Sequence, residues 1–287
     1  MQSLWMLAAA FLFSLMAVCA KLGAEHFSTF ELVLYRALFG VVTLGAWVAL
    51  NRRTLRTPHF PSHMLRSFFG TLALMIWFWT LGALPLGTAM TLNYTSPLYM
   101  ALFVSIVAWR AGGRPDPRLL AAVAAGFGGV VLALRPELHS GEELAALLGL
   151  SAGFFAALAY WQVKGLSKIG EPEWRIVFYF SLFGCVTALA AQLLTAGGLT
   201  PVRLEDLPAL LGVGLTATTA QLCLTRAWAA GNMLLTSALQ FSAIVFAAVL
   251  GLLFFGEPVA PSTALGIAVI ILAGVTATVL TKRRPQK

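Results

Sequence analysis

Long apolar runs alternate with short polar breaks along nearly the whole of this 287-residue chain. Each run approaches the roughly 20 residues that an α-helix needs to cross a bilayer. The shortest of them lies near the lower limit for a span. The pattern predicts an all-α integral membrane protein with ten transmembrane helices, over 3–22, 29–50, 65–83, 86–109, 118–134, 142–163, 174–195, 208–229, 232–255 and 261–281.

Composition agrees with the hydropathy pattern, since 59% of the residues are hydrophobic and only 10% are charged. Soluble domains carry about 25% charged residues. The first span is expected to be an uncleaved helix rather than a secretory signal, because Met1–Ser3 holds no Lys or Arg. The three cysteines lie inside or at the end of spans without CxxC spacing, so we expect packing residues and neither a metal site nor a cofactor.

The net charge of +8 is unevenly distributed along the chain. With the N-terminus inside, most basic residues fall on the cytoplasmic face: Arg52, Arg53, Arg56, Arg66, Arg110, Arg114, Arg118, Lys164, Lys168, Arg175, Arg226, Lys282, Arg283, Arg284 and Lys287. Retention of Lys and Arg on that face predicts a multi-pass protein of the cytoplasmic (inner) membrane with both termini cytoplasmic. Nucleic acid is not needed to explain the charge.

The chain repeats itself at an offset of 144 residues. "LFGVVT" at 38–43 returns as "LFGCVT" at 182–187. Further matches at the same offset pair Tyr35 with Tyr179, Gly87 with Gly231 and Pro117 with Pro261. Each half then holds five spans, and an odd number inverts the second half in the membrane. We expect two inverted five-helix repeats, 1–140 and 141–287, that rock about a substrate site near the midplane and expose it alternately to each side.

One segment resembles a known transporter family. "FFGEPVAPSTALGIAVIILAGV", residues 254–275, is similar to the closing motif of the drug/metabolite transporter superfamily, EamA type, through Gly256-Glu257-Pro258 followed by Gly266 and Gly274. Arg36 in span two also resembles a feature of that family. The resemblance implies ten spans in two halves, cytoplasmic termini and transport of a small molecule, and it does not specify the cargo.

The repeat departs from this pattern at two positions. Gly113 stands where the offset would place a copy of Glu257, and Phe241 stands where the first half has Pro97. Because proline removes a backbone donor, we expect Pro97 to act as a hinge in span four. A bend in span nine is less expected.

Polar residues inside spans four and nine are the first candidates for substrate binding. Asn93 and Ser96 share a helical face, and the offset places Ser237 opposite Asn93 and Gln240 opposite Ser96. Polar residues in lipid face a cavity or a partner helix, so the alternative is a role in interhelical hydrogen bonding, which we favour for Ser237. In span eight, Gln221 has the same two interpretations.

Arg36 is the one cation placed within a span, and an unpaired guanidinium there costs at least about 2.5 kcal/mol. It either binds a substrate carboxylate or serves as a structural pin between helices, and we favour the pin. Aromatic candidates for the cavity wall are Trp77, Trp79, Tyr94 and Tyr99. Trp77 and Trp79 could equally lie in an interfacial belt, which is the preferred placement for Tyr160 and Trp161.

The motifs present and absent distinguish three classes of function. An intramembrane enzyme is disfavoured, because all four histidines fall in loops and neither HExxH nor GxSxG occurs. A scaffold is disfavoured, because it does not need inverted halves. No Walker A motif is present, which favours an ATP-independent secondary transporter. Arg36 and the polar centre favour an amino acid or a similar zwitterionic or anionic solute. The alternative is an exporter of cationic or aromatic drugs by proton antiport, although only Glu31 and Glu257 lie near spans. A monomer is sufficient for either mechanism.

Overall fold

The computed structural model describes residues 2–256 and 258–282, and these form helices and loops without strands. Glu257 and the tail residues Arg283, Arg284 and Lys287 lie outside the described residues. The α-helices are α1 (Trp5–Gly23), α2 (Thr29–Leu50), α3 (Phe60–Ala83), α4 (Leu86–Asn93), α5 (Ser96–Arg110), α6 (Pro117–Leu134), α7 (Glu143–Lys168), α8 (Glu173–Ala196), α9 (Leu207–Ala230), α10 (Met233–Gln240), α11 (Ser242–Phe255) and α12 (Pro261–Lys282).

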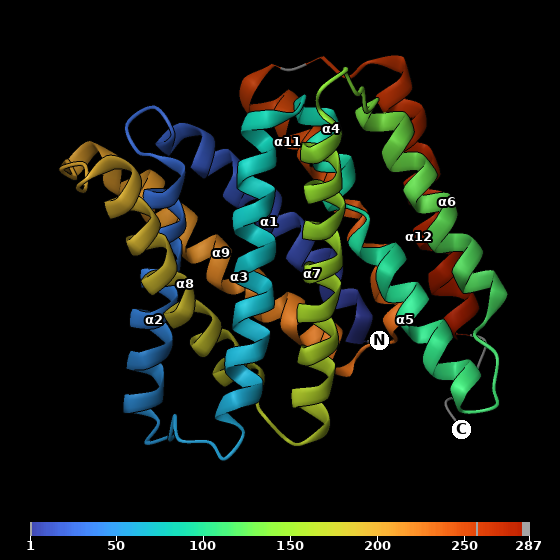
Figure 1. Ribbon diagram of the computed structural model, residues 1–287, viewed down its shortest axis with the longest axis horizontal. Coiled ribbons are helices and arrows are strands. Elements are labelled where there is room, and N and C mark those ends of the chain that lie inside the picture. The colour runs from blue at the N-terminus through green and yellow to red at the C-terminus, as the bar shows by residue number, and fades with distance from the viewer. Residues whose placement is uncertain (1, 257, 283–287) are drawn as a thin grey trace.

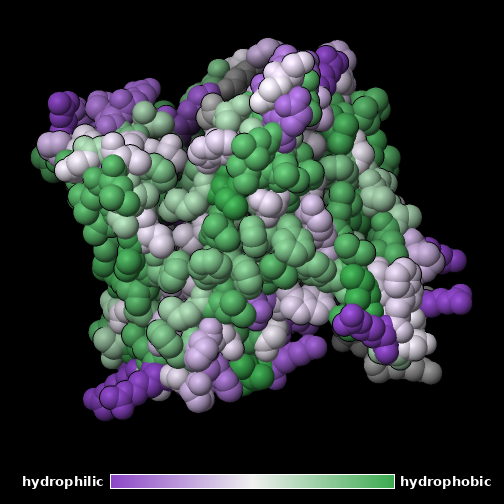
Figure 2. Space-filling view, viewed as in Figure 1, coloured by the Kyte–Doolittle hydropathy of each residue, from purple (hydrophilic) through white to green (hydrophobic). Residues whose placement is uncertain are grey.

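Ten spans account for these helices, because α4 with α5 and α10 with α11 each form one broken span. Within the described ranges, nine segments are long and apolar enough to cross a membrane. Helix α3, with 24 residues, is long enough to be the tenth. Hydrophobic residues cover the middle of the visible face in Figure 2, and hydrophilic residues gather at its upper and lower ends. The prediction of an all-α membrane protein with ten spans is confirmed.

Both broken spans are interrupted near their middle, for different reasons. In span four the missing N–H of Pro97 ends the regular hydrogen bonding, and the chain makes a tight turn in which Thr95 N–H donates to Leu92 O over 3.1 Å. Span nine breaks at Phe241 without a proline. There the fully buried Phe241 ring fills a notch at Gly126, where a Cβ would come within 2.7 Å of the ring. Tertiary packing therefore supplies a bend that the local sequence did not predict.

The most extensive contacts between helices join the first half of the chain to the second (Figure 1). Helix α1 packs along α9, and α7 packs along α3 in the matching arrangement. Helices α2 and α8 pair with each other, as do α6 and α12. The last pair approaches closely, since a Cβ on Gly129 would meet Gly266 O at 2.8 Å. The predicted boundary at 140/141 falls in the loop between α6 and α7, and the division there stays a prediction.

Two carboxylate clusters tie α2 and α8 together at opposite ends. In the first, which we term the Glu31 clasp, the fully buried carboxylate accepts hydrogen bonds from Ser28 N–H over 2.8 Å and from Thr200 Oγ1 over 3.1 Å. Thr200 lies in the loop that follows α8, whereas Ser28 caps α2. This clasp holds the start of α2 against the end of α8.

The second cluster, the Glu171 clasp, binds the loop after α2 to the start of α8. The Glu171 carboxylate accepts hydrogen bonds from Arg175 Nη1 over 2.8 Å and from Thr57, and it lies 3.1 Å from His63 Nε2. Burial alone would raise the pKa of Glu171, but the contacts from Thr57, Arg175 and His63 together hold that pKa below its ordinary value. The two clasps therefore hold α2 and α8 together at both ends.

Candidate functional site

A central cavity of about 290 Å³ lies between the two halves. Helices from both halves contribute to its wall, with small Ala and Gly residues leaving the space open. The side chains in this wall that carry hydrogen-bonding groups are Ser14, Arg36, Arg66, Trp77, Asn93, Tyr94, Tyr160, Gln221 and Gln240. A largely apolar pocket with a few convergent polar groups is the usual form of a small-molecule site.

Six of the predicted site residues line this cavity: Arg36, Trp77, Asn93, Tyr94, Gln221 and Gln240. They come from α2, α3, α4, α9 and α10 and from the break after α4, so the fold gathers residues that are far apart in the sequence. Their placement makes them available to a solute, and their roles in binding stay a prediction.

The other four predicted residues do not line the cavity. Trp79 is 53% exposed on the outer surface of α3. Tyr99 packs against Phe154, with ring centroids 5.5 Å apart. Ser237 is buried and donates to Met233 O within its own helix, over 2.9 Å.

Ser96, the fourth, joins the two halves. Its Oγ accepts a hydrogen bond from Gln240 Nε2 over 3.3 Å, between residues that the 144-residue offset pairs. The neighbouring Pro97 is buried at the start of α5. The two broken spans therefore meet directly beside the cavity, and hinge motion at Pro97 stays a prediction.

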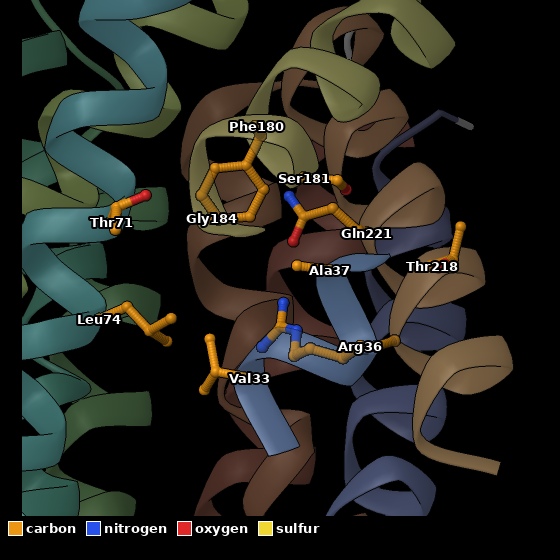
Figure 3. A pocket seen from close by; sticks show the side chains of 11 residues that line it. Val33, Arg36, Ala37, Thr71, Leu74, Phe180, Ser181, Gly184, Thr218 and Gln221 are labelled. Atoms are coloured by element: carbon orange, nitrogen blue, oxygen red, sulfur yellow. The ribbon is translucent and has the colours of Figure 1, made fainter. Parts of the chain in front are cut away.

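Arg36 reaches from α2 toward α3, into a small side pocket that continues from the cavity (Figure 3). The Gln221 amide lies beside its guanidinium, and Leu74 of α3 faces them across the gap. No described residue forms an ion pair with Arg36. The close approach of α2 to α8 here depends on Gly40, because a Cβ there would meet Ser181 Oγ at 2.7 Å. Gly40 of the repeated motif thus serves helix packing at the edge of the site.

The cavity also holds two residues that sequence reasoning missed. Arg66 was assigned to the cytoplasmic charge, but its side chain is only 2% exposed and lies over the Phe180 ring, 3.9 Å from the centroid. Gly70, one helical turn later, leaves the room that Arg66 occupies, since a Cβ there would meet Nη1 at 2.5 Å. Tyr160, assigned to an interfacial belt, instead lines the cavity and stacks on Trp228 at 4.9 Å.

The charged side chains that line the cavity are all positive among the described residues. Two guanidinium groups line the cavity, and no carboxylate does so among the described residues. No group of three metal-ligating His, Cys, Asp or Glu side chains occurs in the described part of the chain. Such a site can hold a solute that carries negative charge and hydrogen-bond acceptors.

A cavity between two interlocked halves of a ten-span bundle is the architecture of a secondary transporter. The chain belongs to the EamA-like transporter family, which matches residues 1–135 and 143–279. The pseudopaline exporter CntI of Pseudomonas aeruginosa (strain UCBPP-PA14) is 28% identical over 269 residues, which cover 92% of this chain and 91% of the exporter.

Two further comparisons support the assignment. A riboflavin transporter of Rhizobium johnstonii is 30% identical over 280 residues, which cover 94% of this chain and 88% of that protein. A solved structure titled "Crystal structure of protein" superposes with a TM-score of 0.84 at 20% identity and covers 99% of both chains, which shows the shared fold. The protein is therefore a multi-pass membrane transporter of small metabolites.

Proposed function

We propose that the chain moves an amino acid or a similar zwitterionic or anionic solute across the cytoplasmic membrane, by alternating access to the central cavity. One observation carries this proposal: Arg36 reaches a cavity wall that contains no carboxylate among the described residues. A guanidinium within a membrane span and without an acidic partner is costly, and a solute carboxylate would satisfy it in bidentate geometry. Gln221, beside Arg36, supplies a further amide group for the same solute.

The cavity volume favours a small solute. About 290 Å³ is at the lower limit of the volumes that ordinary ligand sites occupy. A lipophilic cation would require a counter-charge that the wall does not provide, so export of cationic drugs is the weaker candidate. The relatives named for pseudopaline and for riboflavin are similarly distant, so the chemistry of the wall is the better guide to cargo.

Coupling and topology complete the proposal. With no acid in the described wall, uniport or exchange accounts for transport without a proton relay. One chain provides both halves of the cavity, so a monomer is sufficient. Helix α1 begins and α12 ends toward the same face of the molecule, and we assign that face to the cytoplasm from the distribution of Lys and Arg (Figure 1).

A thermal-shift screen of the purified protein against metabolite classes tests the proposal. A ligand at about 100 times its dissociation constant stabilises the state it binds by about 2.7 kcal/mol. We expect amino acids or small carboxylates to raise the Tm of the wild type, and Arg36→Gln to abolish that ligand-dependent shift. Arg203→Gln, at an exposed loop arginine, is the matched control and should keep it. A shift produced only by cations, or one retained in Arg36→Gln, would overturn the proposal.

A further inference from the structure

The cavity wall presents more unpaired polar atoms than a single carboxylate can satisfy. Nε and Nη1 of Arg66, Nε1 of Trp77 and Oε1 of Gln240 are buried and have no hydrogen-bond partner. All three side chains line the central cavity. Buried polar groups in folded proteins are almost always paired, so such a group of unpaired atoms around one space indicates the polar groups of a missing ligand.

Arg66 and Arg36 approach this space from opposite sides of the membrane. Arg36 lies seven residues after the first residue of α2, about 10 Å along the helix, and Arg66 lies six residues after the first residue of α3, about 9 Å along. Consecutive spans run in opposite directions, so the two arginines enter the wall from opposite faces.

The surroundings of Arg66 provide no opposite charge. The Phe180 ring supports one face of the guanidinium, and no described carboxylate forms an ion pair with it. A ring face attracts a cation by only about 0.5–2 kcal/mol, which is less than the cost of burying the charge. A carboxylate at the unpaired N–H groups of Arg66 would offset the remainder, as it would at Arg36.

We propose that the site is built for a solute with two separate acidic groups, an acidic amino acid or a comparable small dicarboxylate, with Arg66 as the residue that selects the second acid. This assignment rests on the proposed function, since it extends the same cavity and the same Arg36 contact. Arg36 binds one carboxylate and Arg66 binds the other. Gln240 Oε1 accepts a hydrogen bond from a donor on the solute between them, such as an ammonium group.

Amino acids that differ by one charge at nearly constant shape test this assignment. The purified full-length protein is titrated with L-aspartate, L-glutamate and L-2-aminoadipate, and with L-asparagine and L-glutamine as amides of the first two. A second charge-assisted contact should make the wild type bind the acid about 10- to 100-fold more tightly than the matching amide. In Arg66→Gln the ratio should fall to about one, whereas affinity for the amide should change little. Arg66→Lys should keep part of the preference.

Each outcome distinguishes selection by Arg66 from a packing role against Phe180. A packing role would weaken acid and amide equally in Arg66→Gln and leave their ratio unchanged, which would overturn the inference. Should Arg66→Gln fail to fold, the ratio in Arg66→Lys decides, because an unchanged ratio there overturns it as well. If amides or other monocarboxylates bind the wild type through Arg36 but acids bind no better, this inference fails and the proposed function stands. If no zwitterion or anion binds, both fail.

Discussion

The Glu171 clasp allows a quantitative prediction about what holds α2 and α8 together. Glu171→Gln keeps the shape of the side chain but removes its charge. Three partners contact the carboxylate: Thr57, His63 and Arg175. Hydrogen bonds to charged groups contribute about 1 kcal/mol more than neutral ones. The two hydrogen bonds, from Thr57 and Arg175, therefore predict a loss of roughly 2 kcal/mol in the free energy of unfolding. At about 2–4 °C per kcal/mol, the Tm in detergent should fall by about 4–8 °C.

The exposed Arg203–Glu205 pair, with its nitrogen and oxygen 3.2 Å apart, provides the matched control. Exposed ion pairs contribute about 0–1 kcal/mol, so Glu205→Gln should change the Tm by at most about 2–4 °C. Equal losses in the two variants would refute the assignment of the clasp as a structural tie.

The pH dependence of the same comparison follows from the lowered pKa of Glu171. A carboxyl whose pKa is lower in the folded state stabilises the fold above its unfolded value, about 4.3, and loses this contribution as the pH falls through the folded value. The Tm difference between wild type and Glu171→Gln should therefore stay constant from about pH 8 to pH 5.5 and shrink below about pH 4. Because His63 lies in the same cluster, the series is repeated in a His63→Gln background. A difference that grows on acidification would contradict the reasoning.

Two further predictions use neighbouring residues as controls. Gly129→Leu should lower the free energy of unfolding by about 1–3 kcal/mol, because its side chain would be forced against α12 near Gly266. Gly128→Leu is the control and should be nearly neutral in thermal unfolding, since a Cβ there meets nothing within 4 Å. Trp77→Phe should reduce the ligand-dependent Tm shift by removing an unpaired cavity donor, and Trp79→Phe should leave it intact. Equal effects within either pair would argue against the placement of these side chains.

The sequence predicted the spans because these depend on local patterns. Runs of apolar residues set the helices, and Pro97 marks the break in span four. The offset of 144 residues, taken from the repeated motif, is also the separation between Ser96 and Gln240 in the hydrogen bond that joins the broken spans. A repeat in sequence thus carried information about a contact in space.

Other features depend on packing that a linear pattern does not contain. The break at Phe241 arises because its ring enters the notch at Gly126. Arg66 lies near the start of its span, where a basic residue normally reaches toward water. Its inward direction depends on the space at Gly70 and on the Phe180 ring, and Phe180 lies on a helix of the other half. The spacing of Arg66 and Gly70, one helical turn apart, was the available signal.

Solute flux through Arg36 variants tests the central claim most directly. Wild-type protein, Arg36→Lys, Arg36→Gln and Arg203→Gln are reconstituted at equal amounts, and exchange of the labelled amino acid that gives the largest thermal shift is measured. Loss of a charged contact costs about 2–5 kcal/mol, so Arg36→Gln should slow exchange at low solute concentration by at least about 30-fold, with Arg36→Lys between it and the wild type. Arg203→Gln should match the wild type. Exchange by Arg36→Gln at the wild-type rate would contradict the account.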